Sequence, residues 1–304
     1  MSALTVATVA GSQRRRCRRQ LEALAAQSVA SEIEVVVVDT RPELGGIRPP
    51  EGLSTRILGG DSLSFGEARA LGARSADGEI VAYLEEHCYP QQGWAEALIH
   101  AYRGPWASVG YAVGNANPSL RTQITYLAHY GEWERPAPGA ATSLPGNNVS
   151  YRREVLLELD SDLPALLMAD YNLHARLRRD GVPLAIEPAA RVLHENETLI
   201  DGCRSSLAYS RVLAVERARM EGWGRGRRLR HAATILAMGP LLRLARLVRA
   251  TARRPLRLLQ VGIFSPAIVV QYLSSAVGES IGCLFGVGGG SARLMYWEVD
   301  APRG

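Results

Sequence analysis

The chain has 304 residues, which suits one large α/β domain or two ordinary ones. Apolar residues make up 47% and charged residues 21%, which excludes a wholly disordered chain and a coiled coil. All 35 basic side chains are arginines. Residues 1–200 hold 19 arginines and 24 acids (net −5), whereas residues 201–304 hold 16 arginines and 6 acids (net +10). The basic C-terminal third predicts an anionic partner, either a membrane surface or nucleic acid.

The first third of the chain alternates between strand and helix patterns. Apolar runs predict strands at residues 4–10, 33–38 and 79–84, and helical spacing predicts helices at residues 17–27, 65–75 and 92–102. The run IEVVVV at residues 33–38 is typical of a parallel strand that is covered on both faces. A capping box, Ser64-Phe65-Gly66-Glu67, begins the helix at residues 65–75. This order predicts a doubly wound α/β sheet with ligands at the C-terminal ends of its strands.

Beyond residue 102 the patterns are less regular. We expect a strand at residues 107–113, helices at residues 120–130 and 169–180, and short strands at residues 184–186 and 191–194. From residue 199 onward the pattern is helical and basic. The expected domains are therefore residues 1–198 and residues 199–304. The four cysteines form no CxxC pair, which favours a reduced, cytoplasmic compartment.

Polar side chains follow two of the predicted strands directly. Asp39 follows IEVVVV, where its carboxylate could accept hydrogen bonds from a base or a ribose, or serve as a turn or helix cap. Glu85, Glu86 and His87 follow the strand at residues 79–84. Glu85 and His87 point the same way in an extended chain, so both could bind one divalent ion, and this mixed pair suits Mn²⁺ better than Mg²⁺. A solvated acidic turn is the alternative for this motif.

The order of these features resembles the family 2 glycosyltransferases of the GT-A fold, over roughly residues 4–194. The matching features follow one another along the chain: VATVAGS, LEALAAQ, VVVVD ending at Asp39, ARALG ending at Gly72, ADGE ending at Glu79, IVAYLEEH, Pro90, Gly93-Trp94, PGNNVSYRRE beginning at Pro145, Ala169-Asp170 leading into HARLRRDG, and His194. The chain departs from the family where Ala70 replaces Asn, where Glu85 and His87 replace the two carboxylates of Asp-x-Asp, and where Ala169 replaces a frequent Glu.

The resemblance implies an inverting glycosyltransferase, a hexosyl or related sugar transferase that moves a sugar from a nucleotide-sugar donor to an acceptor hydroxyl or phosphate. It implies a Rossmann-like, mixed but mostly parallel sheet flanked by helices. It implies these site residues: Gly11, Asp39, Arg69, Glu85 and Glu86 for the donor, Gly146, Asn147 and Asn148 on the acceptor side, Glu85 and His87 for the metal with His194 as an open third ligand, and Asp170 as the catalytic base. The metal would be Mn²⁺ or Mg²⁺.

The C-terminal third predicts an amphipathic helix at residues 229–253, broken or restarted at Gly239-Pro240. One basic stripe follows helical spacing: Arg243, Arg246, Arg249 and Arg253. Apolar residues lie roughly opposite the stripe: Leu241, Leu244, Ala245, Val248 and Ala252. Such helices lie in anionic membrane interfaces, so we expect a peripheral or shallowly embedded protein at the cytoplasmic face of the bacterial cell membrane. The alternative is a packed helix with its arginines in solvent, and nucleic acid is not expected because no aromatic platform accompanies the arginines.

Residues 261–287 carry one charge, Glu279, and we expect Ser265-Pro266 to begin a helix there. Small residues recur every four positions, namely Ser274, Gly278, Gly282 and Gly286. This face suits close packing on a neighbouring helix or on a second subunit, which leaves a homo-oligomer open. Polar residues dilute the run, which favours a shallow or packed helix over a membrane span.

A membrane location favours a polyprenyl-linked or other cell-envelope glycan acceptor. Two other functions stay open. A soluble natural-product glycosyltransferase would leave the basic amphipathic helix unexplained. A non-catalytic relative that binds nucleotide or glycan would explain the replaced metal carboxylates, although Asp170 is kept.

Overall fold

The computed structural model describes residues 2–146 and 148–304. By internal contacts, the described chain forms two compact units. The sheet unit comprises Met1–Gly114, Arg135–His194 and Glu298–Ala301, and the helical unit comprises Asn115–Glu134, Glu195–Trp297 and Pro302–Gly304. The predicted division at residue 198 differs from this one at Asn115–Glu134, at residues 195–198 and at Glu298–Ala301.

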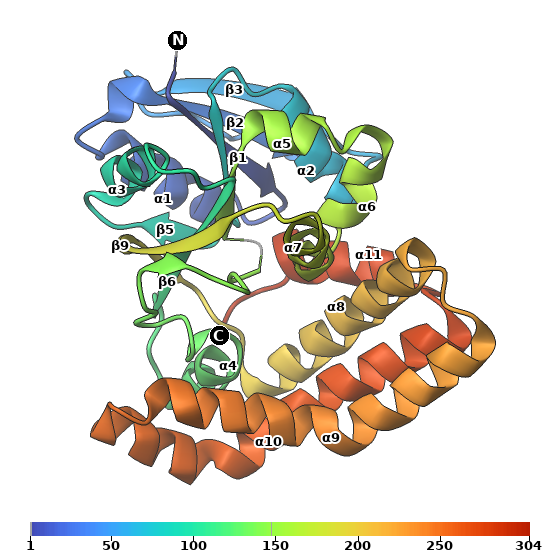
Figure 1. The fold of residues 1–304 in the computed structure, drawn as a ribbon. Coiled ribbons are helices and arrows are strands. Elements are labelled where there is room, and N and C mark those ends of the chain that lie inside the picture. The colour runs from blue at the N-terminus through green and yellow to red at the C-terminus, as the bar shows by residue number, and fades with distance from the viewer. Residues whose placement is uncertain (1, 147) are drawn as a thin grey trace. The chain divides into compact units, whose positions relative to one another are not determined.

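A mixed sheet forms the centre of the sheet unit (Figure 1). Its strands are β1 (Leu4–Ala10), β2 (Ile33–Asp39), β3 (Ser54–Gly59), β4 (Ile80–Tyr83), β5 (Cys88–Pro90), β6 (Ser108–Asn115), β7 (Gly139–Ala140), β8 (Val149–Arg152) and β9 (Leu184–His194). The order is β3-β2-β1-β4-β8-β6-β9-β5, and β7 pairs with β9. The neighbours β3, β2, β1 and β4 are parallel, whereas β8 is antiparallel to both β4 and β6.

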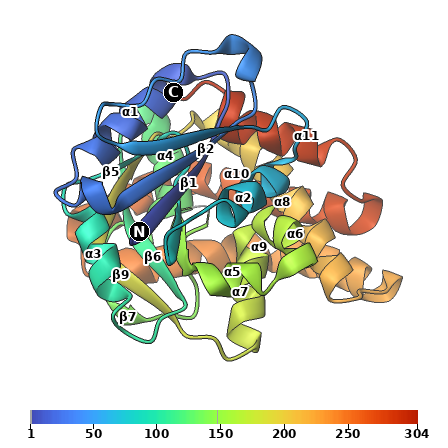
Figure 2. The ribbon, with the colours of Figure 1, turned by 90° about the horizontal axis from the view of Figure 1, so that it is seen from above.

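Helices cover both faces of the parallel strands. The helices of the sheet unit are α1 (Arg14–Ala25), α2 (Phe65–Arg74), α3 (Trp94–Ala101), α5 (Arg153–Leu157), α6 (Leu163–Leu167) and α7 (Asp170–Arg179). Seen from above in Figure 2, α1 and α2 lie on opposite sides of β1 and β2. Gly72 allows α2 to approach β1, since a Cβ at this position would lie 3.1 Å from the Cβ of Ala7. The capping box at Ser64 is confirmed, because Ser64 and Glu67 exchange both hydrogen bonds.

The predicted fold class and the strands with long apolar runs are confirmed. β1 and β2 are buried along their whole length, as a parallel strand covered on both faces requires. β3 was not predicted because it carries no buried apolar run: none of its residues is buried. The two short strands that were expected near residues 184–194 form a single strand, β9.

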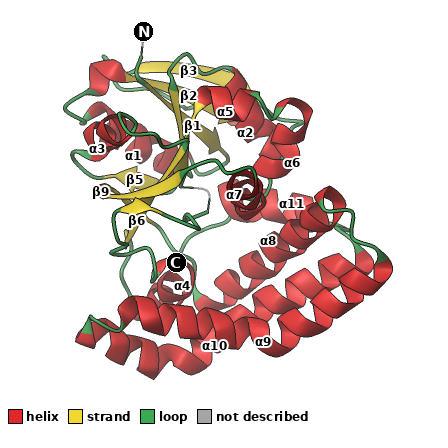
Figure 3. Ribbon diagram, in the orientation of Figure 1, coloured by secondary structure: helices red, strands yellow, loops and turns green. Residues whose placement is uncertain are grey.

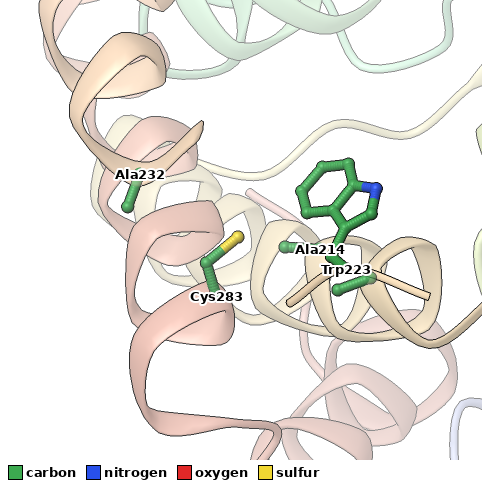
Figure 4. Close-up of a cluster of buried hydrophobic side chains, with 5 residues drawn as sticks. Ala214, Trp223, Ala232 and Cys283 are labelled. Carbon is green, nitrogen blue, oxygen red and sulfur yellow. The ribbon is translucent and has the colours of Figure 1, made fainter. Parts of the chain in front are cut away.

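The helical unit consists of helices alone, which Figure 3 shows in red. They are α4 (Leu120–Tyr130), α8 (Leu199–Met220), α9 (Arg225–Thr251), α10 (Pro255–Phe285) and α11 (Gly290–Met295). α10 packs against both α8 and α9. Buried side chains from all three helices and the turn after α8 meet in one cluster, drawn in Figure 4: Ala214, Ala218, Trp223, Ala232 and Cys283. The long helices therefore have an apolar core of their own.

Both predicted proline boundaries in this unit were wrong. α9 runs through Gly239-Pro240, and both residues are buried in it. α10 begins at Pro255, its first residue, so Pro266 lies inside the helix and does not begin it. A proline removes one hydrogen bond from a helix, whereas packing between α9 and α10 extends over many turns. The packing therefore outweighs the local signal.

The small-residue face of α10 packs closely, but within the same chain. A Cβ at Gly278 would overlap the carbonyl oxygen of Leu207, and a Cβ at Gly282 would overlap that of Arg211. Both carbonyls belong to α8. The face is therefore covered by α8, and the prediction that it binds a second subunit is not supported.

The predicted basic stripe of α9 is exposed at three of its four arginines. Arg243 is only half-exposed, and it donates a hydrogen bond of 2.9 Å to the buried carboxylate of Glu279 on α10. The rest of the stripe is exposed, namely Arg246, Arg249 and Arg253. The predicted apolar face is also open to solvent, since Leu241 is 63% and Val248 38% exposed. The alternative of a packed helix, with its apolar face buried, is therefore wrong for Leu241 and Val248.

Candidate functional site

The candidate site lies where β4 ends. The motif Glu85-Glu86-His87 begins two residues after the last residue of β4, and β5 then pairs with β9 in a register that places Cys88 opposite His194. The pairing therefore brings the late histidine to the acidic motif. Glu85 is 9% exposed and His87 is fully buried, so the alternative of a solvated acidic turn is wrong.

Three side chains of this motif and β9 converge on one point. The Nε2 atoms of His87 and His194 lie 3.1 Å apart. Oε2 of Glu85 lies 3.3 Å from Nε2 of His194 and 3.7 Å from Nε2 of His87. The thiol of Cys88 lies 3.6 Å from the same carboxylate oxygen. We call Glu85, His87 and His194 the carboxylate–histidine cluster.

The carboxylate–histidine cluster fits a divalent metal ion. Metal bonds of about 2.0–2.2 Å place two ligands of one ion roughly 3.0–3.5 Å apart, close to the separations seen here. Glu85, Cys88 and His194 also offer ligand atoms that lie within 4.8 Å of one another. Imidazole nitrogens with a carboxylate suit Mn²⁺ or another transition metal better than Mg²⁺.

Electrostatics keep Glu85 ionised. Burial alone would raise the pKa of its carboxyl, but the nearby His87 and His194 lower it well below its ordinary value. Nδ2 of Asn148 donates a hydrogen bond of 2.6 Å to Oε2 of Glu85. This contact links the predicted acceptor-side loop to the cluster. Within that loop, Gly146 accepts from the backbone N–H of Asn148, and Asn147 lies outside the described residues.

Glu86 faces the end of β1 and not the cluster. Its Oε2 accepts a hydrogen bond of 3.0 Å from the backbone N–H of Gly11. Arg16, on the first turn of α1, lies 3.9 Å from Oε1 of the same carboxylate. Two residues that were predicted to bind the donor, Gly11 and Glu86, are therefore bonded to each other.

Asp39 lies at the end of β2 with its carboxylate bonded on both oxygens. The guanidinium of Arg14 donates to Oδ1 and Oδ2 at 2.8 and 3.0 Å. The backbone N–H of Arg41 also donates to Oδ1, which is the turn geometry that was the alternative for this residue. The sequence signal for this contact was the basic cluster that begins at Arg14, four residues after the predicted strand at residues 4–10.

Arg69 and Asp170 form a buried ion pair, although 101 positions separate them. Both nitrogens of the guanidinium donate to the carboxylate of Asp170, which is completely buried. Arg69 also donates to the carbonyl oxygen of Leu167 at 2.8 Å and lies over the ring of Tyr83, 4.3 Å from its centre. Burial alone would lower the pKa of Arg69, but Asp170 raises it above its ordinary value. Arg69 therefore stays protonated in this buried position.

Several of these groups line one pocket. Its lining includes polar and aromatic side chains: Phe65, Arg69, Tyr83, Glu85, Glu86 and Glu298. The empty space, with the open solvent at its mouth, is about 270 Å³. Glu298 was not predicted as a site residue. It is one of six acidic residues after residue 200. An acidic residue in this otherwise basic region was the sequence feature that could have marked it as a site residue.

No family model and no curated protein matches the sequence. Among solved structures, the chain is similar to the mannosyltransferase PcManGT from Pyrobaculum calidifontis in complex with GDP-Man and Mn²⁺, at 16% identity over 93% of this chain and 87% of that one, with a TM-score of 0.55. It is also similar to residues 1–349 of S. aureus TarS, at 16% identity, 91% and 90% coverage and a TM-score of 0.48. GalNAc-T7 with UDP, GalNAc and Mn²⁺ gives 17% identity and a TM-score of 0.49, over 64% of this chain and 44% of that one.

The likeness to PcManGT shows the fold. The chain has a GT-A glycosyltransferase fold: a mixed sheet, parallel from β3 to β4, flanked by helices and followed by C-terminal helices. The three neighbours are glycosyltransferases, and each was crystallised with a nucleotide or nucleotide sugar in at least one structure.

Proposed function

We propose that this protein is a metal-dependent inverting glycosyltransferase that transfers a sugar from a nucleotide-sugar donor to an acceptor hydroxyl. The observation that supports this proposal best is the carboxylate–histidine cluster at the C-terminal end of β4 in a GT-A fold. Ligands of open α/β sheets bind at the C-terminal ends of the strands. PcManGT, which shares the fold, was crystallised with GDP-Man and Mn²⁺.

In this proposal, Glu85, His87 and His194 hold the metal ion, and Asn148 keeps the Glu85 carboxylate in place. A bound divalent ion would neutralise the charge that develops on the leaving diphosphate. Gly11, Asp39 and Arg69 bind the nucleotide. Glu86 supports this region, because it holds the backbone of Gly11 at the end of β1.

We assign Asp170 the role of general base, which takes the proton of the acceptor hydroxyl during in-line attack on the anomeric carbon. Asp170 is completely buried, and each of its two carboxylate oxygens accepts a hydrogen bond from Arg69. The base needs one free oxygen. Donor binding would free one oxygen of Asp170 if a donor group accepted one of the two hydrogen bonds that Arg69 donates to it.

We also propose that the helical unit docks on an anionic membrane surface, where a polyprenyl-linked or other envelope glycan acceptor would be found. Of the twenty large apolar side chains that are exposed among the described residues, fourteen lie on α9 and α10. The same two helices are long and apolar enough to cross a membrane by length and composition. Exposed apolar side chains that gather on one part of a protein mark a site of interaction with a membrane or another protein.

The arginines of α9 border this apolar surface. Helical spacing places Leu241, Ala245 and Val248 on one line and Arg249 and Arg253 on the next. A charged row beside an apolar row is typical of a helix that lies in a membrane interface and not across it. A soluble natural-product glycosyltransferase remains the second reading, and it predicts no binding to lipid vesicles.

The experiment that tests the enzyme is a donor screen. Thermal shift with UDP, GDP and dTDP, each with and without Mn²⁺, should raise the melting temperature for at least one nucleotide, and only when Mn²⁺ is present. His194→Ala should remove the shift, whereas His100→Ala, an exposed histidine on α3, should keep it. A metal-dependent shift without sugar transfer to any acceptor would favour the non-catalytic relative. No shift with any nucleotide would refute the proposal.

A further inference from the structure

The segment Glu298–Ala301 returns to the sheet unit and lies against the ends of β1 and β2; we call it the strap. Two of its bonds are made by the Asp300 carboxylate, which accepts from the backbone N–H of Ser12 at 2.8 Å and from Arg41 at 3.0 Å. Two more are made by strap carbonyls. Gln13 donates to the carbonyl oxygen of Asp300 at 3.2 Å, and Arg16 donates to that of Ala301 at 2.9 Å.

The strap also packs directly on β1. Val299 is buried, and a Cβ at Gly11 would overlap its carbonyl oxygen. Gly11 therefore has room for the strap only because it has no side chain. Glu298, the residue before Val299, lines the pocket together with Arg69, Glu85 and Glu86.

These contacts fall on the residues that the proposed function assigns to the donor. Gly11 is covered by Val299, and the N–H of the next residue, Ser12, is taken by Asp300. The cavity that is left is about 10 Å³, roughly the room of one water molecule, whereas ordinary small-molecule sites measure roughly 300–1,000 Å³. A nucleotide sugar does not fit this site while the strap is in place.

We infer that the strap is an autoinhibitory segment, which closes the nucleoside end of the donor site and must leave before the donor binds. The inference rests on the proposed function, because it takes the ends of β1 and β2 as the place of the nucleoside. In this arrangement the nucleotide and the strap compete for the same groups. The donor has ribose, base and phosphate oxygens that can accept the bonds of the Ser12 N–H and of Arg41 in place of Asp300.

The bonds of the strap are of a kind that can open. The Arg41 side chain is half-exposed, and an ion pair with one exposed partner contributes little net stability. The strap holds one large apolar side chain in its buried part, Val299. Of the four hydrogen bonds, only the one from Arg16 to Ala301 is buried, and the bond from Arg41 is exposed. A segment with few apolar contacts and few buried hydrogen bonds belongs to the part of a protein that opens most easily.

The test is the affinity for UDP, GDP and dTDP in the presence of Mn²⁺, measured by calorimetry on the full chain. Asp300→Ala removes the bonds to Ser12 and Arg41 and leaves the proposed metal ligands intact. If the closed form dominates, the apparent dissociation constant equals the intrinsic one divided by the open fraction. We therefore expect Asp300→Ala to bind the preferred nucleotide about three- to tenfold more tightly than the parent. Glu51→Ala, which removes an exposed acid before β3, should bind it as the parent does.

Hydrogen exchange gives a second measurement that does not depend on the variant. Saturating nucleotide should speed exchange of the strap amides in the parent, because the strap leaves the site. Weaker binding by Asp300→Ala, or slower exchange of the strap with nucleotide, would overturn the inference and make the strap a lid that completes the site. Equal affinity of parent and variant would also overturn it. Failure of parent and variant alike to bind any nucleotide would refute the proposed function itself.

Discussion

Replacing one partner of the buried Arg69–Asp170 pair should cost far more stability than replacing an exposed pair. Asp170→Asn keeps the shape of the side chain but removes its charge, and it turns an amide N–H₂ toward one guanidinium nitrogen. Removing one partner of a buried pair costs about 3–5 kcal/mol, because the other charge stays buried. Arg69 keeps its bond to the Leu167 carbonyl and its place over the Tyr83 ring, which argues for the lower end, about 3 kcal/mol.

Guanidinium chloride unfolding at pH 7 measures this loss, and α7 supplies a matched control. Asp180 pairs with Arg176 at 2.6 Å, but both side chains are more than 40% exposed, so Asp180→Asn should cost less than about 1 kcal/mol. The double variant Arg69→Gln, Asp170→Asn should lose less than the sum of its two single variants, since neither buries an unpaired charge. If Asp170→Asn lost no more than Asp180→Asn, the buried pair would not stabilise the fold as argued here.

Three other predictions concern acid, metal and lipid. Burial lowers the pKa of His174 from 6.5 to about 4. Between these pH values the unfolded state binds a proton that the folded state does not bind. The free energy of unfolding should therefore fall as the pH drops from 6.5 toward 4, with a loss of about 2–3 kcal/mol at pH 4.5. His174→Asn should lack this pH-dependent loss. Parallel pH profiles of the parent and the variant would contradict the prediction. Mn²⁺ should raise the melting temperature of the parent and EDTA should reverse the rise, whereas His194→Ala should respond to neither. The parent should float with anionic vesicles at low salt and not with neutral ones, and replacing Arg246, Arg249 and Arg253 with Gln should release most of it, because each arginine contributes about 1 kcal/mol near an anionic surface. Equal flotation with both kinds of vesicle would count against electrostatic docking.

The sequence predicts elements well where burial has a local signature. The runs at β1 and β2 and the capping box at Ser64 were readable because the pattern and the structure use the same few neighbouring residues. The two prolines of α9 and α10 misled for the converse reason. Their local effect on a helix is known, but the packing that outweighs it comes from residues far along the chain.

The same distinction holds at the site. The sequence placed Glu85, Glu86 and His87 after a strand, but their distance to His194 depends on the register of β5 against β9. The Arg69–Asp170 pair spans 101 positions, and the bond from Ser12 to Asp300 spans 288. No periodicity or spacing reports such contacts. The resemblance to a family suggested which residues belong to the site, and the structure supplied their partners.

The pairing of β5 with β9 has a consequence for how the protein matures. The two histidines of the cluster are 107 positions apart, and they meet only after β9 has docked on the sheet. A chain that stops short of β9, or one that docks it out of register, lacks the third ligand. If the proposed metal ion binds there, it would bind the paired strands more tightly than a chain with β9 undocked, and it would stabilise the paired state. Metal uptake during refolding would then report the docking of β9 in its native register.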